Sequence, residues 1–146
     1  MEMQIKIPSD WPFAHIYTES ERGRSTFYPT PEALAERLLK DVKWNRIESI
    51  LEPSAGKGDL ARYCVGKIHY SRYHWPPHNS KEMEKAIREA DIDCIEIDPA
   101  LRKTLDSFGY RVVHDDFLTY ETQKRYHLIV MNPPLGTACQ RRVSQV

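Results

Sequence analysis

The chain has 146 residues, with 21 Lys plus Arg and 21 Asp plus Glu, so its formal net charge is zero. This length suits one domain with a buried core, and the charge balance gives no overall attraction to nucleic acid or to a membrane surface. No apolar run approaches the roughly 20 residues that span a bilayer, and the first residues lack the apolar core of a signal peptide.

The cysteines give no sign of a metal site. Cys64, Cys94 and Cys139 are widely spaced and form no C-x-x-C pattern. An odd number of cysteines with such spacing indicates neither a disulfide framework nor a zinc site. We therefore expect a cytoplasmic protein that binds no metal ion.

The N-terminal part contains one strong helix signal. Residues 1–27 form an extension in which prolines and a glycine interrupt any helix. A helix is predicted over residues 30–43, because apolar side chains recur there on one helical face. Thr30 is a good N-cap residue for it, and Pro31 fits the first helical position.

A glycine turn follows the first predicted strand. An apolar run at residues 47–51 indicates a buried strand, and Glu52 comes directly after it. A turn with Gly56 and Gly58 then leads into a helix, as in the strand–turn–helix unit of a doubly wound sheet. The turn matches neither the P-loop nor the full G-x-G-x-x-G pattern. A carboxylate before a glycine turn instead favours a ligand that carries positive charge and hydroxyl groups.

The next segment is rich in aromatic residues. The helix after the glycine turn is predicted to end near His69, before a proline-containing loop over residues 70–79. Three histidines and three aromatic residues lie within residues 69–78, a composition that also occurs in metal sites and base-stacking surfaces. The histidine spacing matches no zinc pattern, so we interpret this segment as a loop folded against its own helix. Ser80 is predicted to cap a helix that runs to Ala90.

The second half of the chain alternates strands with helices. Three further strands are predicted in apolar runs, at residues 92–97, 110–113 and 127–131. A helix that stops at Gly109 separates the first two of them. This alternation indicates an α/β fold, a doubly wound parallel sheet with helices on both faces. Residues 1–146 would then be a single partial domain with only the first four strands, and residues 136–146 an irregular tail.

The predicted strand ends suggest a family. They carry Glu52, Glu96, Asp116 and Asn132, and a parallel sheet places such ends along one edge. In order and spacing these segments resemble the class I S-adenosylmethionine-dependent methyltransferases. The closest group is the one with an N-P-P-aromatic signature, which includes N6-adenine DNA methyltransferases. The resemblance covers about residues 27–135 and implies a Rossmann-like sheet, of which the first four strands are present.

The resemblance implies S-adenosyl-L-methionine as the cofactor. It assigns the methionine end of the cofactor to the segment before the first helix, with Tyr28, Thr30 and Pro31. It assigns the loop beneath the cofactor to Glu52, Pro53, Ser54, Ala55, Gly56 and Gly58. Glu96 is similar to the acid that binds the ribose hydroxyls, with Ile97 beside it. Asp116 resembles the acceptor for the amino group of the cofactor adenine, with Phe117 packing next to that ring. The neighbouring candidates, ranked second, are Asp59, Asp98 and Asp115.

The segment Asn132-Pro133-Pro134-Leu135 resembles the catalytic motif. The exocyclic amino nitrogen of adenine is a poor nucleophile, because its lone pair is delocalised into the ring. The Asn132 side-chain oxygen and the Pro133 carbonyl can each accept one of its N–H groups, and both prolines restrict the backbone around them. In a duplex the target base must also be flipped out. Leu135 departs from the aromatic residue that the family uses to stack on the base.

Three functions follow from this resemblance. Adenine in DNA is the favoured target, and RNA or an amide nitrogen in a protein is the alternative, because planar NH₂ groups pose the same chemical problem. A third interpretation is a catalytically inactive remnant that binds only the cofactor or a partner. A sheet that stops after four strands also leaves an uncovered edge, for which we expect self-association.

Overall fold

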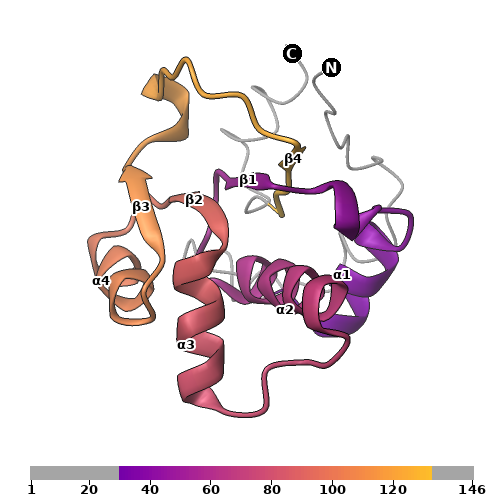
Figure 1. Cartoon of the computed structure of the whole chain (residues 1–146). Helices are drawn as coiled ribbons and strands as arrows, with labels where there is room; N and C mark the ends of the chain where they lie inside the picture. The colour runs from indigo at the N-terminus through magenta and orange to yellow at the C-terminus, as the bar shows by residue number, and fades with distance from the viewer. Residues whose placement is uncertain (1–29, 133–146) are drawn as a thin grey trace.

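The computed structural model describes residues 30–132, which form a four-stranded parallel sheet with helices. The strands are β1 (Ser49–Glu52), β2 (Asp91–Ile95), β3 (Arg111–His114) and β4 (Leu128–Ile129). Their order is β3-β2-β1-β4, so β1 lies in the centre (Figure 1). The register of the sheet places Ile50 of β1 opposite Ile92 of β2 and Leu128 of β4. The predicted α/β class, a Rossmann-like parallel sheet of four strands, is confirmed.

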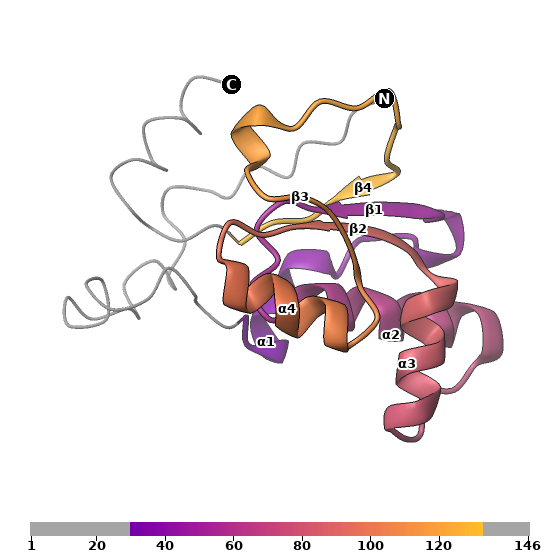
Figure 2. The same cartoon turned by 90° about the vertical axis from the view of Figure 1, so that its left-hand side faces the viewer.

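The helices pack on one face of this sheet. They are α1 (Glu32–Leu39), α2 (Asp59–Tyr73), α3 (Ser80–Glu89) and α4 (Pro99–Ser107). Figure 2 shows all of them below the strands, and buried apolar residues from each form one core cluster with Ile50, Ile92 and Cys94. Among the described residues, no helix is long and apolar enough to cross a membrane.

Within residues 30–132, the second face of the sheet differs from the predicted doubly wound arrangement. The doubly wound arrangement requires a helix on each face, but the connection from β3 to β4 contains only the short 3₁₀ helix η2 (Phe117–Thr119). The reason is that residues 115–127 lack an apolar helical face, and Phe117 and Leu118 are both exposed. This connection passes over the second face without an α-helix (Figure 2).

The first helix begins and ends differently from the prediction. Pro31 occupies the N-cap of α1, and its carbonyl oxygen accepts hydrogen bonds from the backbone N–H groups of Leu34 and Ala35. Thr30 is therefore not the cap. The helix also ends at Leu39, and the short 3₁₀ helix η1 (Trp44–Arg46) then leads into β1.

The connection between α2 and α3 is shorter than predicted. α2 continues past His69 to Tyr73, and His74 ends it in the left-handed conformation with φ of 63°. Asn79 caps α3, because its side-chain oxygen accepts a hydrogen bond from the backbone N–H of Glu82 at 2.9 Å. The predicted cap, Ser80, is instead the first helical residue.

Two strands are shorter than predicted. β2 ends at Ile95, so Glu96 and Ile97 follow the strand, and β4 contains only Leu128 and Ile129. Within residues 30–132, β4 pairs with β1 alone, and its other edge has no described strand. Self-association through this edge remains a prediction.

A polar network around Asp93 ties the connection before β4 to the second face. Asp93 is buried in β2, and its Oδ2 accepts hydrogen bonds from the Tyr126 hydroxyl at 2.7 Å and from Lys124 Nζ at 2.9 Å. Arg111 of β3 pairs with Oδ1. Burial would raise the pKa of Asp93, but these hydrogen bonds outweigh it and hold the pKa below its ordinary value. The stabilisation is therefore present at neutral pH and lost in acid.

The network can be tested by removing one hydroxyl. Tyr126→Phe should lower the free energy of unfolding by about 1.5 kcal/mol, the lower end of the range for a hydrogen bond to a charged group. Tyr120→Phe is the matched control, because the Tyr120 hydroxyl contacts the Tyr126 hydroxyl at 3.0 Å and not Asp93. Urea unfolding at pH 7 measures both variants. Equal stability of Tyr126→Phe and the parent would contradict the role given to this hydrogen bond.

Candidate functional site

The predicted site residues follow the carboxyl ends of the four strands. Glu52 ends β1, and Glu96, Asp116 and Asn132 come after β2, β3 and β4. Glu52 is 1% exposed and Glu96 is 8% exposed, whereas Asp116 and Asn132 are half-buried. Because β1 lies between β2 and β4, Glu52 is at the centre of this edge.

Glu96 fastens the glycine loop to the end of β2. The backbone N–H of Gly56 donates to Glu96 Oε1 at 2.8 Å, and the N–H of Ala55 donates to the Ile95 carbonyl at 3.0 Å. The second carboxylate oxygen, Oε2, accepts from the N–H of Asp98 at 2.9 Å. Sequence reasoning assigned this carboxylate to a ligand and missed its structural role. Each oxygen has two lone pairs, so acceptor capacity for a ligand remains.

Glycine is required at position 58 for two reasons. Gly58 has a φ of 91°, which side chains rarely adopt, and it starts α2. A Cβ atom there would lie 2.9 Å from Cε2 of Tyr110 and 3.1 Å from Cδ2 of Leu105. Gly56 also has a positive φ, of 57°. Both glycines thus adopt a positive φ, and the closest neighbour of a Cβ at Gly58 is a tyrosine ring of the protein itself.

Glu52 is a buried acid without a basic ion-pair partner in the described part of the chain. Its Oε1 accepts hydrogen bonds from the backbone N–H of Ser54 at 2.9 Å and from the Ser54 hydroxyl at 3.3 Å. It forms no ion pair with a Lys or Arg among residues 30–132. Burial raises the pKa of Glu52 from 4.5 to about 8 against the lowering effect of Ser54, and the Glu96 carboxylate raises it further.

A side chain of α4 holds the turn that connects β2 to this helix. Arg102 donates to the carbonyl oxygens of Glu96 and Ile97, both at 2.8 Å, a contact that no sequence pattern signals. The Asp98 side chain caps α4 by accepting from the N–H of Ala100 at 2.8 Å. Asp98 is therefore used within the fold, while the side chain of Ile97 is exposed beside the site.

The segment that follows β3 carries an acid and an exposed apolar side chain. Asp116 Oδ1 accepts from the backbone N–H of Leu118 at 3.0 Å, which fixes the start of η2. Phe117 is exposed, as its predicted contact with a ligand ring requires. The second-ranked acids Asp59 and Asp115 are both exposed.

A hydrogen bond joins the start of α1 to the end of β4. The amide nitrogen of Asn132 donates to the Thr30 hydroxyl at 3.3 Å, across 102 positions of the chain. Thr30, assigned to the methionine end of the cofactor, and Asn132, assigned to the target base, therefore lie side by side. With its nitrogen held by Thr30, the amide directs its oxygen to the other side as an acceptor.

Part of the predicted site lies outside the described residues. These predictions concern Tyr28, Pro133, Pro134 and Leu135, together with the extension at 1–27 and the tail at 136–146. Within residues 30–132 there is no group of three or more His, Cys, Asp or Glu side chains that could hold a metal ion.

The burial of Glu52 makes stability depend on pH. Because its pKa in the folded chain, about 8, exceeds its ordinary value of 4.5, the folded state keeps a proton that the unfolded state loses. Stability is then full below pH 4.5 and decreases until the pH passes about 8. The parent should lose on the order of 3–5 kcal/mol more than Glu52→Gln between pH 5 and pH 9.

Urea unfolding at several pH values measures this difference. Glu48→Gln is the matched control, because Glu48 is an exposed acid just before the same strand. We expect this control to follow the parent. Parallel pH profiles for the parent and Glu52→Gln would show that Glu52 ionises freely in the folded chain.

The chain matches no family model. A comparison with curated proteins finds the Type II methyltransferase M.CvrRI of Paramecium bursaria Chlorella virus XZ-6E, which is 23% identical over 121 residues. The match covers 82% of this chain and 27% of the virus protein, so the chain spans about a quarter of that relative's length. The sequence similarity and the Rossmann-like parallel sheet together support a distant relationship of this chain to methyltransferases.

Proposed function

We propose that the chain is the cofactor-binding part of an S-adenosylmethionine-dependent N-methyltransferase that acts on an adenine amino group in DNA. The carrying observation is the pair of buried acids, Glu52 and Glu96, which have no ion-pair partner among residues 30–132. Buried acids of this kind are costly unless a ligand brings positive charge. The distant similarity to a methyltransferase points to a sulfonium cofactor as that ligand.

The chemistry of the described residues fits this cofactor. It offers an ammonium, a sulfonium, two ribose hydroxyls and an adenine amino group, all of which favour acceptors or negative charge. Burial keeps Glu52 largely protonated at neutral pH, and a cation bound nearby would favour its ionised form. Glu96 has remaining lone pairs for ribose hydroxyls. The exposed side chains of Ile97 and Phe117 offer apolar contact to an adenine ring.

Asn132 is the proposed positioning group for the target nitrogen. The bound cofactor supplies an electrophilic methyl group. The Asn132 side-chain oxygen would accept one N–H of the target amino group, which opposes delocalisation of the lone pair into the ring. Thr30 holds the amide nitrogen at 3.3 Å, so the direction of the oxygen is fixed before a substrate arrives. DNA as the target rests on the resemblance of the N-P-P segment to adenine methyltransferases.

Cofactor binding is the first test. Titration calorimetry should detect S-adenosylmethionine binding, and Glu96→Gln should weaken it by roughly 1–3 kcal/mol because the variant loses a charged acceptor. Glutamine keeps one oxygen for the loop, and a thermal melt reports whether the loop remains in place. Glu48→Gln, an exposed change, should bind as the parent does. Equal affinity of Glu96→Gln and the parent would remove Glu96 from the cofactor site.

Methyl transfer is the second test. With labelled cofactor at saturation, DNA should accept label from the parent, and Asn132→Ala should abolish transfer while cofactor affinity stays unchanged. Thr30→Val should reduce transfer less, because it only frees the Asn132 amide. Thr104→Val is the matched control, since that hydroxyl bonds within α4 to the Ala100 carbonyl.

The outcomes of this assay separate the three functions. If label is transferred to RNA or protein and not to DNA, the methyltransferase activity stands and only the proposed substrate is wrong. Equal transfer by the parent and Asn132→Ala would contradict the adenine mechanism. Cofactor binding without transfer to any of the three substrates would favour the inactive remnant.

A further inference from the structure

The end of α2 carries an exposed aromatic surface, here termed the aromatic platform, formed by Tyr70, Tyr73 and Trp75. These residues are 53%, 42% and 50% exposed. The centroids of the Tyr73 and Trp75 rings are 6.0 Å apart, and His69 Nδ1 hydrogen-bonds to the Trp75 carbonyl at 2.9 Å. The segment is thus folded against its own helix, as the sequence predicts, but its three aromatic side chains stay about half exposed.

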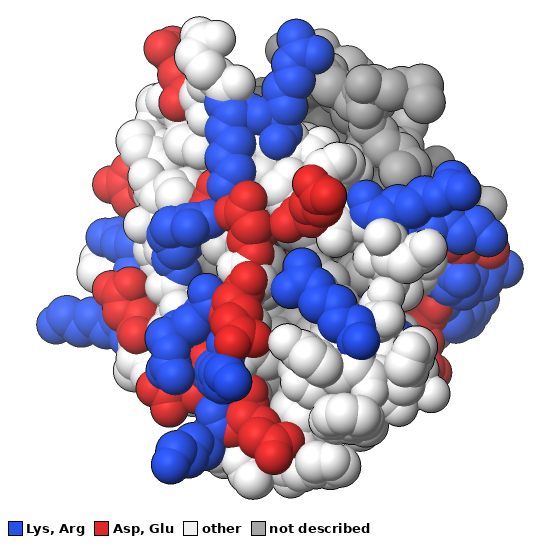
Figure 3. All heavy atoms as spheres, in the orientation of Figure 1, with Lys and Arg blue, Asp and Glu red and all other residues white. Residues whose placement is uncertain are grey.

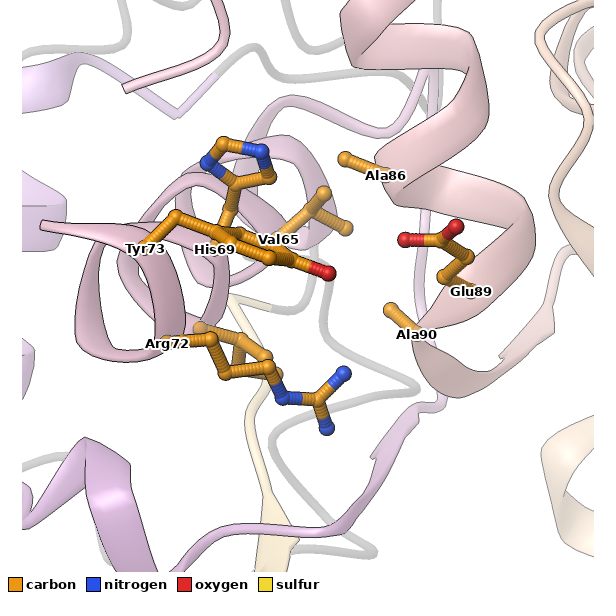
Figure 4. Close-up of a pocket in the computed structure, with 8 residues that line it drawn as sticks. Val65, His69, Arg72, Tyr73, Ala86, Glu89 and Ala90 are labelled. Atoms are coloured by element: carbon orange, nitrogen blue, oxygen red, sulfur yellow. The ribbon is translucent and has the colours of Figure 1, made fainter. Parts of the chain in front are cut away.

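Two cations flank the platform. Lys67 and Arg72 make no ion pair with a carboxylate in the part of the chain that the structure describes. Figure 4 shows Arg72 extending from α2 toward the end of α3, where Glu89 lies. The crevice between these helices has a volume of about 10 Å³, too small for an organic ligand. In Figure 3 the surface over the α2–α3 connection is mostly uncharged.

A groove leads from the platform to the candidate site. Its volume is about 560 Å³, and its lining includes Tyr70 and Lys67 at one end and Thr30 and Asp59 at the other. Thr30 is the residue that holds Asn132. The groove therefore runs from Tyr70 of the platform to Thr30, which holds the group proposed to position the target nitrogen.

Gly66 lines the middle of this groove. It stands in the interior of α2, where alanine would favour the helix more. No atom lies within 4 Å of the position that its Cβ would take, so packing among the described residues does not require glycine. A ligand that passes close to the helix backbone would explain why this position is glycine.

We propose that the aromatic platform binds unpaired bases of the nucleic acid strand whose target base lies at Asn132. Exposed rings for stacking beside cations for phosphates are the means by which proteins bind single strands. The inference rests on the proposed function for the place of the target base. Asp59 and Tyr70 are about 16 Å apart along α2, which corresponds to about five nucleotides at 3.4 Å each.

The test is oligonucleotide binding without cofactor, so its result does not depend on methyl transfer. Dye-labelled single strands of DNA and of RNA, ten nucleotides long, are titrated with the whole chain and followed by fluorescence anisotropy. Tyr70→Ala and Trp75→Ala should each weaken binding about fivefold or more. Tyr70→Phe and Trp75→Phe, which keep a ring, should stay close to the parent. Phe108→Ala is the matched control, an aromatic residue 45% exposed next to α4.

Two further arms test the chemistry of the ligand. Lys67→Gln with Arg72→Gln should reduce the salt dependence of single-strand binding by about 1.4 in logarithmic slope, whereas Lys103→Gln on α4 should change it little. A ten-base-pair duplex should bind more weakly than either single strand, because its bases are already stacked.

Three results would overturn the proposal. One is an absence of single-strand binding by the parent, and another is equal binding by the parent and the alanine variants. The third is a concentration-dependent dimer that Trp75→Ala abolishes without any change in oligonucleotide affinity, which would assign the platform to a second copy of the chain. Retained oligonucleotide binding in a chain that binds no cofactor would keep this inference and reject the proposed function.

Discussion

The arrangement of the site depends on one carboxylate that accepts two backbone hydrogen bonds. Glu96 holds the N–H of Gly56 with one oxygen and the N–H of Asp98 with the other. The first bond positions the loop after β1, and the second shapes the turn before α4. Because the two segments share one side chain, the ends of neighbouring strands cannot move independently. A ligand that also engages Glu96 would therefore bind a surface that is already ordered.

Two buried acids in the same sheet illustrate how partners determine charge. Asp93 accepts hydrogen bonds from Tyr126, Lys124 and Arg111, and its pKa is lowered despite burial. Glu52 is bonded to Ser54, and burial dominates its pKa. The first acid stabilises the fold at neutral pH, while the second weakens it. A buried acid without an ion-pair partner lowers stability, and such acids occur most often at binding sites, where a ligand can offset that loss. The position of Glu52 at the carboxyl end of β1 fits such a site.

Much of this arrangement could be predicted, because it follows from local chemistry. The four parallel strands come from apolar runs, and the positive φ at Gly56 and Gly58 from glycine in a short turn. Other features depend on competition between neighbours or on contacts distant in sequence. Ser80 and Asn79 are both good caps, and only the path of the chain favours Asn79. The contact between Thr30 and Asn132 joins residues 102 positions apart, and no local pattern encodes it.

The central place of β1 has a consequence for how the chain reaches its native state. Of the four described strands β1 is synthesised first, yet its residue Ile50 pairs with Ile92 and Leu128, which are synthesised much later. Every pairing that β1 makes in this sheet is thus with a strand far along the chain, and such distant pairings slow folding. During synthesis β1 therefore remains unpaired on both sides until β2 and β4 have been made. Of the strands in this sheet, it is the one that a chaperone could bind for the longest time.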